Sequence, residues 1–338
     1  MRPDVYNLDC RHFTMKYRLQ DISVVIPTFN RKEDLEITLR SFIRNIKQLE
    51  EVLIIDQSPN KKTKNLIDSL KNKKIKYYRS SVTSLTMARN FGVSNISGTS
   101  KIIIFLDDDV SLEKDYFQNI IQVFNSHPQS LGVSGYYLPA DNTTTIEQKL
   151  RKIFFIEHLE ENSCKVLSAY CAVYPSTLNR TIDAHWLPGF NMAFKKEVFE
   201  KELFDENLSK YALGEDFDFS YRIYKRYGGR LFLTPKAKLT HRVSNIGRYP
   251  SKKISYMNQI NHSYINFKNF NQNFNEKIRF LWCIFGIGIL RSLKFFITRK
   301  NIDWLKLRFY AESLFFCLIH LKEIREGRLK ELYNKSNV

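Results

Sequence analysis

The stretch Lys101-Ile102-Ile103-Ile104-Phe105-Leu106-Asp107-Asp108-Asp109 places three carboxylates directly after five consecutive apolar residues. A continuous apolar run, unlike an alternating one, is typical of a strand that is buried on both faces of a parallel sheet. Ligands bind such sheets beyond the carboxyl ends of the strands. The three aspartates therefore fall where an α/β protein of this kind is expected to bind its ligand.

Strand and helix patterns alternate on both sides of this stretch. Strand-like runs occupy residues 22–26, 52–55, 75–78, 190–194, 230–233 and 238–243. Apolar residues at helical spacing occupy residues 32–46, 63–70, 84–96, 113–124, 146–158 and 214–227. Residues 167–174 fit either a strand or a buried loop. The alternation predicts an α/β fold with a Rossmann-like, mainly parallel central sheet and helices on both of its faces.

The aspartate triplet is a candidate metal site. Adjacent carboxylates disfavour one another's ionisation, and a divalent cation relieves that repulsion. Hard oxygen ligands select Mg²⁺ or Mn²⁺. In an extended backbone, Asp107 and Asp109 point to one side and Asp108 to the other. The alternative is a surface turn in which Asp109 or Ser111 caps the following helix.

A second acidic cluster, Gly214-Glu215-Asp216-Phe217-Asp218, opens the helical pattern that ends at residue 227. Carboxylates are favoured in the first turn of any helix by the helix dipole. A carboxylate fixed on a rigid helix can also act as a general base toward a hydroxyl. The residues alone leave both interpretations open. The same is true of His241, whose importance depends on whether it faces the triplet.

Together, these segments resemble family 2 glycosyltransferases, which are inverting, nucleotide-sugar-dependent enzymes with a GT-A fold. The similarity covers about residues 20–245, and its motifs occur in the family's order. They are Val24-Val25-Ile26-Pro27-Thr28-Phe29-Asn30-Arg31, Leu53-Ile54-Ile55-Asp56, Ala88-Arg89-Asn90-Phe91-Gly92, Phe105-Leu106-Asp107-Asp108-Asp109, Trp186-Leu187-Pro188-Gly189-Phe190-Asn191-Met192-Ala193-Phe194 and Gly214-Glu215-Asp216, with His241 beyond them. The turn Gln57-Ser58-Pro59 departs from the small Gly/Ser-rich turn of many relatives.

The resemblance implies a role for each matching residue. Asp216 would be the general base, with Glu215 beside it as a second catalytic residue. Asp109 and His241 would bind Mg²⁺ or Mn²⁺. The residues implied in binding a nucleotide-diphosphate sugar donor are Pro27, Thr28, Asn30, Asp56, Arg89, Asp107, Asp108 and Gly189. Trp186 and Asn191 would bind the acceptor, a growing surface glycan or a lipid-linked glycan as in bacterial polysaccharide synthesis.

The chain has 338 residues and a formal net charge of +18, and the whole excess lies after residue 221. Residues 222–338 contain 24 Lys or Arg and only 6 Asp or Glu. Such an excess favours a polyanionic partner, either nucleic acid or an anionic membrane surface. The alternative is solvated charge on ordinary helices. A hydrophobic content of 43% excludes a disordered chain.

Two apolar runs lie in this basic part, residues 280–290 and 304–319, with Arg and Lys between them. They predict a helical extension that binds an anionic membrane in the plane of its surface. Packing on the catalytic domain or a homodimer interface is the alternative. The longest charge-free run has eleven residues, so we expect no membrane-spanning helix.

The expected organisation is an N-terminal extension (1–20), a catalytic domain (21–250) and a basic, aromatic-rich helical segment (251–338). Five cysteines without a CxxC pair, and a polar N-terminus, predict a cytoplasmic protein on the inner face of the cell membrane. Two other functions compete. A sugar nucleotidyltransferase would also use carboxylates after a strand. A nucleic-acid-binding protein would use the basic charge, but no recognisable binding module is present, so no nucleic-acid partner is expected.

Overall fold

The computed structural model describes residues 16–137, 144–168, 171–244 and 250–337. The chain forms two compact units. The first unit combines residues 1–138, 178–206 and 215–248, and the second combines residues 139–177, 207–214 and 249–338. The second unit thus takes in two segments that precede residue 251. The functional division of the chain into a catalytic domain and a basic segment stays a prediction.

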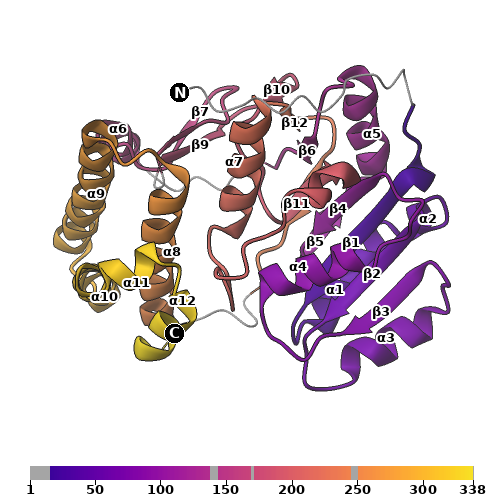
Figure 1. The fold of residues 1–338 in the computed structure, drawn as a ribbon, viewed down its shortest axis with the longest axis horizontal. Helices are drawn as coiled ribbons and strands as arrows, with labels where there is room; N and C mark the ends of the chain where they lie inside the picture. Colours follow the sequence, from indigo (N-terminus) through magenta and orange to yellow (C-terminus); the bar gives the residue numbers. More distant parts are fainter. Residues whose placement is uncertain (1–15, 138–143, 169–170, 245–249, 338) are drawn as a thin grey trace. The chain divides into compact units, whose positions relative to one another are not determined.

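An eight-stranded sheet forms the centre of the first unit, in the order β10-β12-β6-β11-β4-β1-β2-β3 (Figure 1). The strands are β1 (Ile22–Thr28), β2 (Glu51–Asp56), β3 (Ile75–Arg79), β4 (Ile102–Leu106), β6 (Gly132–Gly135), β10 (Ile182–Asp183), β11 (Asn191–Lys195) and β12 (Leu231–Thr234). Strand β1 pairs in parallel with both β2 and β4, and β2 pairs in parallel with β3. Only β11 and β10 pair antiparallel with their neighbours in this sheet. The prediction of a mainly parallel central sheet is confirmed.

Helices cover both faces of this sheet because side chains alternate between the faces along each strand. One face carries Val24, Ile54 and Ile104, which share a buried core with residues of α1 (Lys32–Ser41), α3 (Lys62–Leu70) and α5 (Tyr116–Ser126). The other face carries Val25 and Phe105. A Cβ at Gly92 of α4 (Leu85–Ser94) would lie 2.4 Å from Val25 Cγ1, so glycine lets this helix lie close against β1.

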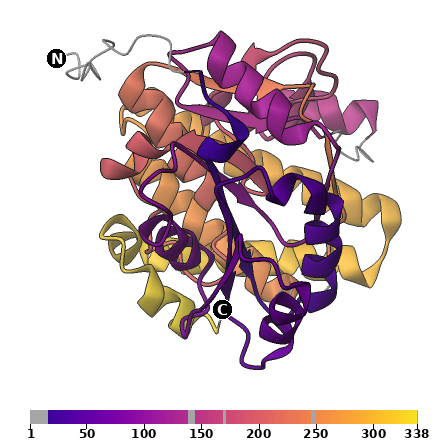
Figure 2. The same ribbon diagram turned by 90° about the vertical axis from the view of Figure 1, so that its right-hand side faces the viewer.

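The same second face receives an aromatic cluster. The Phe105 ring lies 5.2 Å from that of Phe204, which stacks on Phe219 of α7 (Glu215–Tyr227) at 4.2 Å. In Figure 2, the indigo and purple strands of the first unit run between helices of similar colour. The expected arrangement of helices on both faces is confirmed.

Several elements differ from those expected. The helix expected over residues 32–46 is split into α1 and α2 (Ile43–Ile46) at Phe42, whose backbone leaves the helical region to bury its ring against Phe117. The helix expected over residues 146–158 is shorter: α6 (Thr145–Ile153) ends before Phe155, which has a φ of 50°. Strand β6 has no counterpart among the expected strands.

A small two-stranded ladder sits beside the carboxyl end of β4. Strand β5 (Val110–Leu112) pairs antiparallel with β13 (Leu239–His241), and Val110 lies opposite His241. Arg242 fastens this ladder, because its guanidinium donates to the carbonyl oxygens of Val110 (3.0 Å) and of Asp34 in α1 (2.9 Å). The ladder brings the end of the first unit next to the aspartate triplet.

The second unit contains helices and a three-stranded sheet, β7 (His158–Glu160), β9 (Cys171–Pro175) and β8 (Val166–Ser168). Its helices are α6, α8 (Ser251–Asn269), α9 (Phe274–Thr298), α10 (Asn301–Ile319), α11 (Leu321–Arg325) and α12 (Leu329–Lys335). By length and composition alone, α9 would suffice to cross a membrane. The expectation of no such helix is wrong by this criterion, because α9 spans 25 residues and extends on both sides of the charge-free run at residues 280–290.

Candidate active site

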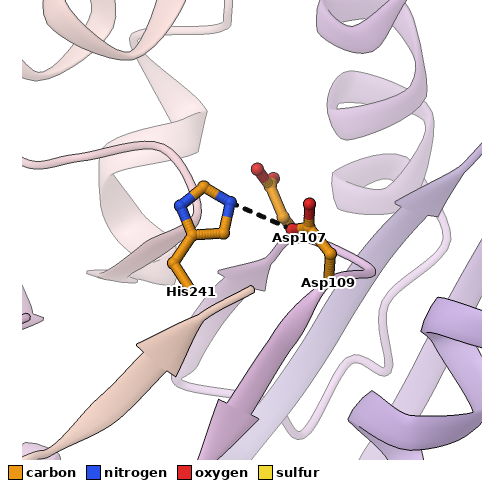
Figure 3. A group of neighbouring side chains, drawn as sticks. All are labelled: Asp107, Asp109 and His241. Carbon is orange, nitrogen blue, oxygen red and sulfur yellow. Dashed lines mark ion pairs between the residues drawn. The ribbon is translucent and has the colours of Figure 1, made fainter. Parts of the chain in front are cut away.

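Asp107, Asp109 and His241 form a compact group of metal-ligand atoms. One ligand atom from each lies within 4.8 Å of the others, and His241 Nε2 is 3.0 Å from Asp109 Oδ1 (Figure 3). The two aspartates come from the turn between β4 and β5, and His241 is the last residue of β13. The sequence predicted all three as functional residues, and the pairing of β5 with β13 explains how residues more than 130 positions apart meet.

This donor set fits a divalent cation. Two carboxylates and an imidazole suit Mn²⁺ well and leave coordination positions for a substrate oxygen or water. The Phe190 ring stacks on the imidazole, with centroids 4.6 Å apart, and so restricts how His241 can turn. Asp107 remains one-third exposed, so the cluster is open on one side.

The pKa values of the two carboxyl groups shift in opposite directions. Burial raises the pKa of Asp107 above its ordinary value, and Arg89 opposes this shift. Burial also acts to raise the pKa of Asp109, but the hydrogen bonds from His241 and from the Ser244 amide outweigh it and lower the pKa to about 2. The Ser244 N–H donates to Asp109 Oδ2 at 2.9 Å. Asp109 is therefore ionised at neutral pH without a metal.

Asp108 is not part of this group, although residues 108 and 109 form a turn and not the extended backbone on which the expected alternation depended. Its carboxylate accepts a hydrogen bond from Thr28 Oγ1 at 2.7 Å and another from Arg31 Nη1 at 3.1 Å. Burial raises its pKa to about 7, although Arg31 favours the ionised form. The sequence grouped Asp108 and Thr28 with the donor-binding residues. In the structure their side chains bond to each other and tie β1 to the turn after β4.

Asp56 ends β2 on the same edge of the sheet. Its Oδ1 accepts the Ser58 N–H at 2.9 Å, and its Oδ2 accepts the Tyr77 hydroxyl at 3.0 Å. The Asn30 N–H donates to Ser58 Oγ at 2.8 Å, and Asn30 has a φ of 56°. The structure thus joins the loops after β1 and β2. Pro27 lies within β1 opposite Ile55 and is buried there.

Arg89 connects the metal-ligand cluster with the second acidic cluster. Its side chain is only 1% exposed, and the guanidinium donates to Glu215 Oε1, to the Gly189 carbonyl oxygen at 2.8 Å and to Asp107 Oδ1 at 3.3 Å. The Phe105 and Phe204 rings lie 6.0 and 5.4 Å from its central carbon. A buried guanidinium with three oxygen acceptors holds those acceptors in fixed positions.

Asp216 lies directly beside Gly189, the residue that precedes β11 by two positions. The Gly189 N–H donates to Asp216 Oδ2 at 2.7 Å, and a Cβ at Gly189 would come within 2.9 Å of Asp216 Cβ. Glycine is therefore required for this close approach. The structure brings Arg89, Gly189, Glu215 and Asp216 together, as the sequence predicted for residues of one site.

The two residues predicted to bind the acceptor, Trp186 and Asn191, differ in burial. Trp186 is half-buried, with its ring 6.2 Å from that of Phe217. Asn191 is fully buried, and its amide bonds to the Tyr116 hydroxyl and to the Gly135 carbonyl oxygen, the latter at 2.7 Å. Asn191 therefore joins β11 to β6 and α5, and these contacts occupy its buried amide.

Sequence reasoning missed three residues that support the site: Arg31, Tyr77 and Ser244. Arg31 ends the motif that begins at Val24. Its positive charge, close to the edge of the sheet where the aspartates were expected, could have identified it as a partner of a carboxylate. Burial, together with Asp56, raises the pKa of Tyr77 to about 12, so its hydroxyl stays a donor. Ser244 acts through its backbone amide, which no sequence signal reveals.

A mainly parallel sheet with a group of residues that could hold a metal ion at its carboxyl edge, and an acidic helix N-terminus beside them, has the architecture of a GT-A glycosyltransferase. Residues 23–202 match the model of the family described as Glycosyl transferase family 2. The chain belongs to this family, and the predicted resemblance is confirmed.

The chain is also similar to individual curated proteins, at low sequence identity. The chain is similar to the minor teichoic acid biosynthesis protein GgaB of Bacillus subtilis, with 25% identity over 73% of this chain and 26% of the relative. It is also similar to the glycosyltransferase GlyA of Streptococcus pneumoniae, with 23% identity over 60% of this chain and 28% of the relative. The chain thus spans about a quarter of the length of these relatives.

Solved structures share the fold. The crystal structure of GalNAc-T7 with UDP, GalNAc and Mn²⁺ superposes with a TM-score of 0.58 and 18% identity, over 87% of this chain and 54% of that one. S. aureus TarS 1-349 in complex with UDP-GlcNAc superposes with a TM-score of 0.50 and 14% identity, over 91% and 88% of the two chains. These similarities confirm the GT-A fold.

Proposed function

We propose that this chain is a metal-dependent inverting glycosyltransferase that moves a sugar from a nucleotide-diphosphate sugar to a hydroxyl of a surface glycan. The observation that supports this most is the cluster of Asp107, Asp109 and His241 at the carboxyl edge of the sheet in a family 2 chain. Asp216, beside Gly189, offers the carboxylate that an acceptor hydroxyl requires.

The donor would lie along the carboxyl edge of β1, β2 and β4. Asp56, with the loop from Pro27 to Asn30, would receive the base and ribose. Asp107, Asp109 and His241 would bind Mg²⁺ or Mn²⁺. When bound, such a cation neutralises negative charge that develops on a leaving diphosphate. Gly189 has no side chain, so its backbone would allow the donor sugar to approach closely.

The acceptor step requires a base near neutral pH. Asp216 would accept the hydroxyl proton while the hydroxyl oxygen forms a bond to the anomeric carbon. The bond from that carbon to the diphosphate oxygen breaks at the same time, and the nucleoside diphosphate leaves with the electron pair. Attack opposite to the leaving group inverts the anomeric centre. Glu215, held by Arg89, would orient this region, and Trp186 would offer an aromatic face to a sugar.

The comparisons support the substrate class. GgaB is named for minor teichoic acid biosynthesis, and one TarS structure contains UDP-GlcNAc. For this chain we therefore propose a nucleotide-diphosphate sugar and an acceptor glycan. A screen of nucleotide sugars for thermal stabilisation, with and without Mn²⁺ or Mg²⁺, tests the proposal. Stabilisation by a nucleotide sugar that requires the metal is expected, and no stabilisation by any donor under either condition would contradict it.

Arg89 is expected to position the site rather than to contact the donor, because its guanidinium is buried and already bonded. Arg89→Lys keeps the charge but loses the forked geometry. We expect kcat to fall roughly 10- to 100-fold, as for a misplaced catalytic group, while the donor KM changes little. Arg40→Lys on the exposed surface of α1 is the control. A raised donor KM with unchanged kcat would instead favour the direct donor contact predicted from the sequence.

The helices α9 and α10 support membrane association. Along α9, exposed apolar side chains recur at helical spacing: they are Phe274, Ile278, Leu281, Trp282, Phe285, Leu293, Phe296 and Ile297. The opposite side of α9 packs inside the second unit, where Gly286 contacts Phe154. An apolar stripe on one side of a helix in a basic unit suits the surface of an anionic bilayer. We propose peripheral binding to the cytoplasmic face of the cell membrane.

Substitution of the stripe tests this. Phe285→Ser with Ile297→Ser, at positions 57% and 81% exposed, is expected to reduce vesicle binding about tenfold or more, because each side chain contributes burial in the bilayer. The control pairs Ile37→Ser with Val82→Ser, two exposed apolar residues of the first unit. Sedimentation with vesicles that contain phosphatidylglycerol measures the effect. Equal sedimentation of all three proteins would remove α9 as the docking surface.

A further inference from the structure

The second unit contains a cavity of about 350 Å³ that none of the proposed catalytic residues lines. Its walls come from four helices, α6, α8, α9 and α10, and from the segment that follows α6. The lining residues are Glu147, Arg151, Ile156, Glu157, Asn258, His262, Ile287, Leu290, Arg291, Lys294, Asp303, Lys306 and Tyr310. This volume lies within the range of small-molecule binding sites.

Cationic side chains from different helices converge on this cavity. Arg291 and Lys294 come from α9, and Lys306 comes from α10. Arg151 of α6 is bound to Glu147, at 3.0 Å. In the described part of the chain, no ion pair joins Lys294 or Lys306 to a carboxylate. Lys294 and Lys306 are solvent-exposed, and the cavity also contains three carboxylates, so its four cationic side chains leave an excess of one positive charge. Such an excess favours an anionic ligand of low charge.

Arg291 is held in place at the wall. Its guanidinium carbon lies 5.1 Å from the centre of the Tyr310 ring, and the Tyr310 hydroxyl donates to the Ile284 carbonyl oxygen at 2.6 Å. Arg291 Nη1 also donates to the Lys306 carbonyl oxygen at 3.4 Å. These contacts fix the position of the guanidinium, whose charge favours a phosphate or carboxylate. The two lysines add positive charge without fixed geometry.

The remaining lining residues restrict the ligand further. Glu147, Glu157 and Asp303 disfavour a ligand of high negative charge, such as a diphosphate. Asn258 and His262 offer hydrogen-bonding groups, and Ile156, Ile287 and Leu290 form an apolar wall. A single phosphate attached to a small carbon skeleton with hydroxyl groups satisfies all of these features.

We propose that this cavity binds a phosphate ester. This proposal goes beyond the proposed glycosyltransferase function and does not rest on it. The phosphate can belong to a soluble glycan chain or to a lipid, since both present the same charged group.

Calorimetric titration of the full chain with sn-glycerol 3-phosphate, and with glycerol as the neutral counterpart, tests the site. We expect binding of the phosphate ester and none of glycerol. Lys294→Gln with Lys306→Gln is expected to weaken binding about fivefold or more, because two charge-assisted contacts are lost. Lys277→Gln with Lys330→Gln removes the same charge from exposed positions of α9 and α12 and is expected to leave binding unchanged.

Equal weakening by both pairs, or no binding by the unsubstituted chain, would overturn the proposal. Vesicles of phosphatidylcholine with phosphatidic acid separate the sources: if they displace glycerol 3-phosphate, the phosphate is a lipid's, and otherwise it is a soluble ester's. Metal-dependent hydrolysis of a nucleotide sugar is measured on the same variants and is expected to be unchanged. If the unsubstituted chain bound the phosphate ester but hydrolysed no nucleotide sugar, this would contradict the proposed function and would not affect the proposed phosphate site.

Discussion

Asp216→Asn is expected to lower sugar transfer roughly 10²- to 10⁴-fold, the range that a general base contributes. The substitution is nearly isosteric, and the Asn oxygen can still accept the Gly189 N–H that Asp216 Oδ2 accepts at 2.7 Å. The acceptor hydroxyl, however, has no carboxylate to take its proton. Donor affinity should change little, because the donor is expected to bind along the edge formed by β1, β2 and β4.

Two measurements separate these effects. Single-turnover transfer reports the chemical step, and calorimetric titration of the nucleotide sugar reports donor affinity. Asp183→Asn makes the same chemical change at an exposed position of the edge strand β10 and serves as the control. Unchanged turnover in Asp216→Asn would remove Asp216 as the base, and Glu215 would become the next candidate.

Asp109→Asn is expected to abolish metal-dependent donor binding. The substitution removes a ligand charge that His241 and the Ser244 amide hold ionised in the free protein. Loss of a second-shell partner alone costs roughly 10- to 100-fold in metal affinity, so loss of a direct ligand should cost at least as much. Asn at this position can still accept the Ser244 N–H, so we expect the fold to persist.

Mn²⁺ binding followed by electron paramagnetic resonance measures the first effect, and donor titration with and without Mn²⁺ measures the second. Asp115→Asn, at an exposed position near the start of α5, is the matched control. Equal donor affinity with and without metal in the unsubstituted protein would contradict the metal assignment, as would full Mn²⁺ binding by Asp109→Asn.

The parallel part of the sheet could be predicted from the sequence because its strands are continuous apolar runs. Strand β6 could not, since Gly132 and Gly135 weaken the strand pattern. The structure explains both glycines: a Cβ at Gly132 would lie 2.7 Å from the Phe194 ring, and one at Gly135 would lie 2.1 Å from the Ala237 carbonyl oxygen. In β6, the need for close approach of neighbouring segments therefore outweighs the low strand propensity of glycine.

In the candidate site, too, some features could be predicted from the sequence and others depend on tertiary contacts. The expected separation of Asp108 from Asp107 and Asp109 assumed an extended backbone, whereas residues 108 and 109 form a turn. The meeting of His241 with Asp109 depends on the pairing of β5 with β13, a tertiary contact with no local signal. Arg89 was assigned to donor binding from its motif, because burial inside an ion-pair network cannot be seen in sequence. Its three oxygen partners belong to three different segments of the chain.

Product analysis of a single reaction tests the central claim most directly. The chain is incubated with Mn²⁺, a nucleotide sugar that stabilises it and a glycan acceptor, and the products are identified by nuclear magnetic resonance. We predict release of the nucleoside diphosphate together with a new glycosidic bond of inverted anomeric configuration. Release of pyrophosphate would indicate a nucleotidyltransferase, and retention of configuration would contradict the single displacement in which Asp216 acts as base.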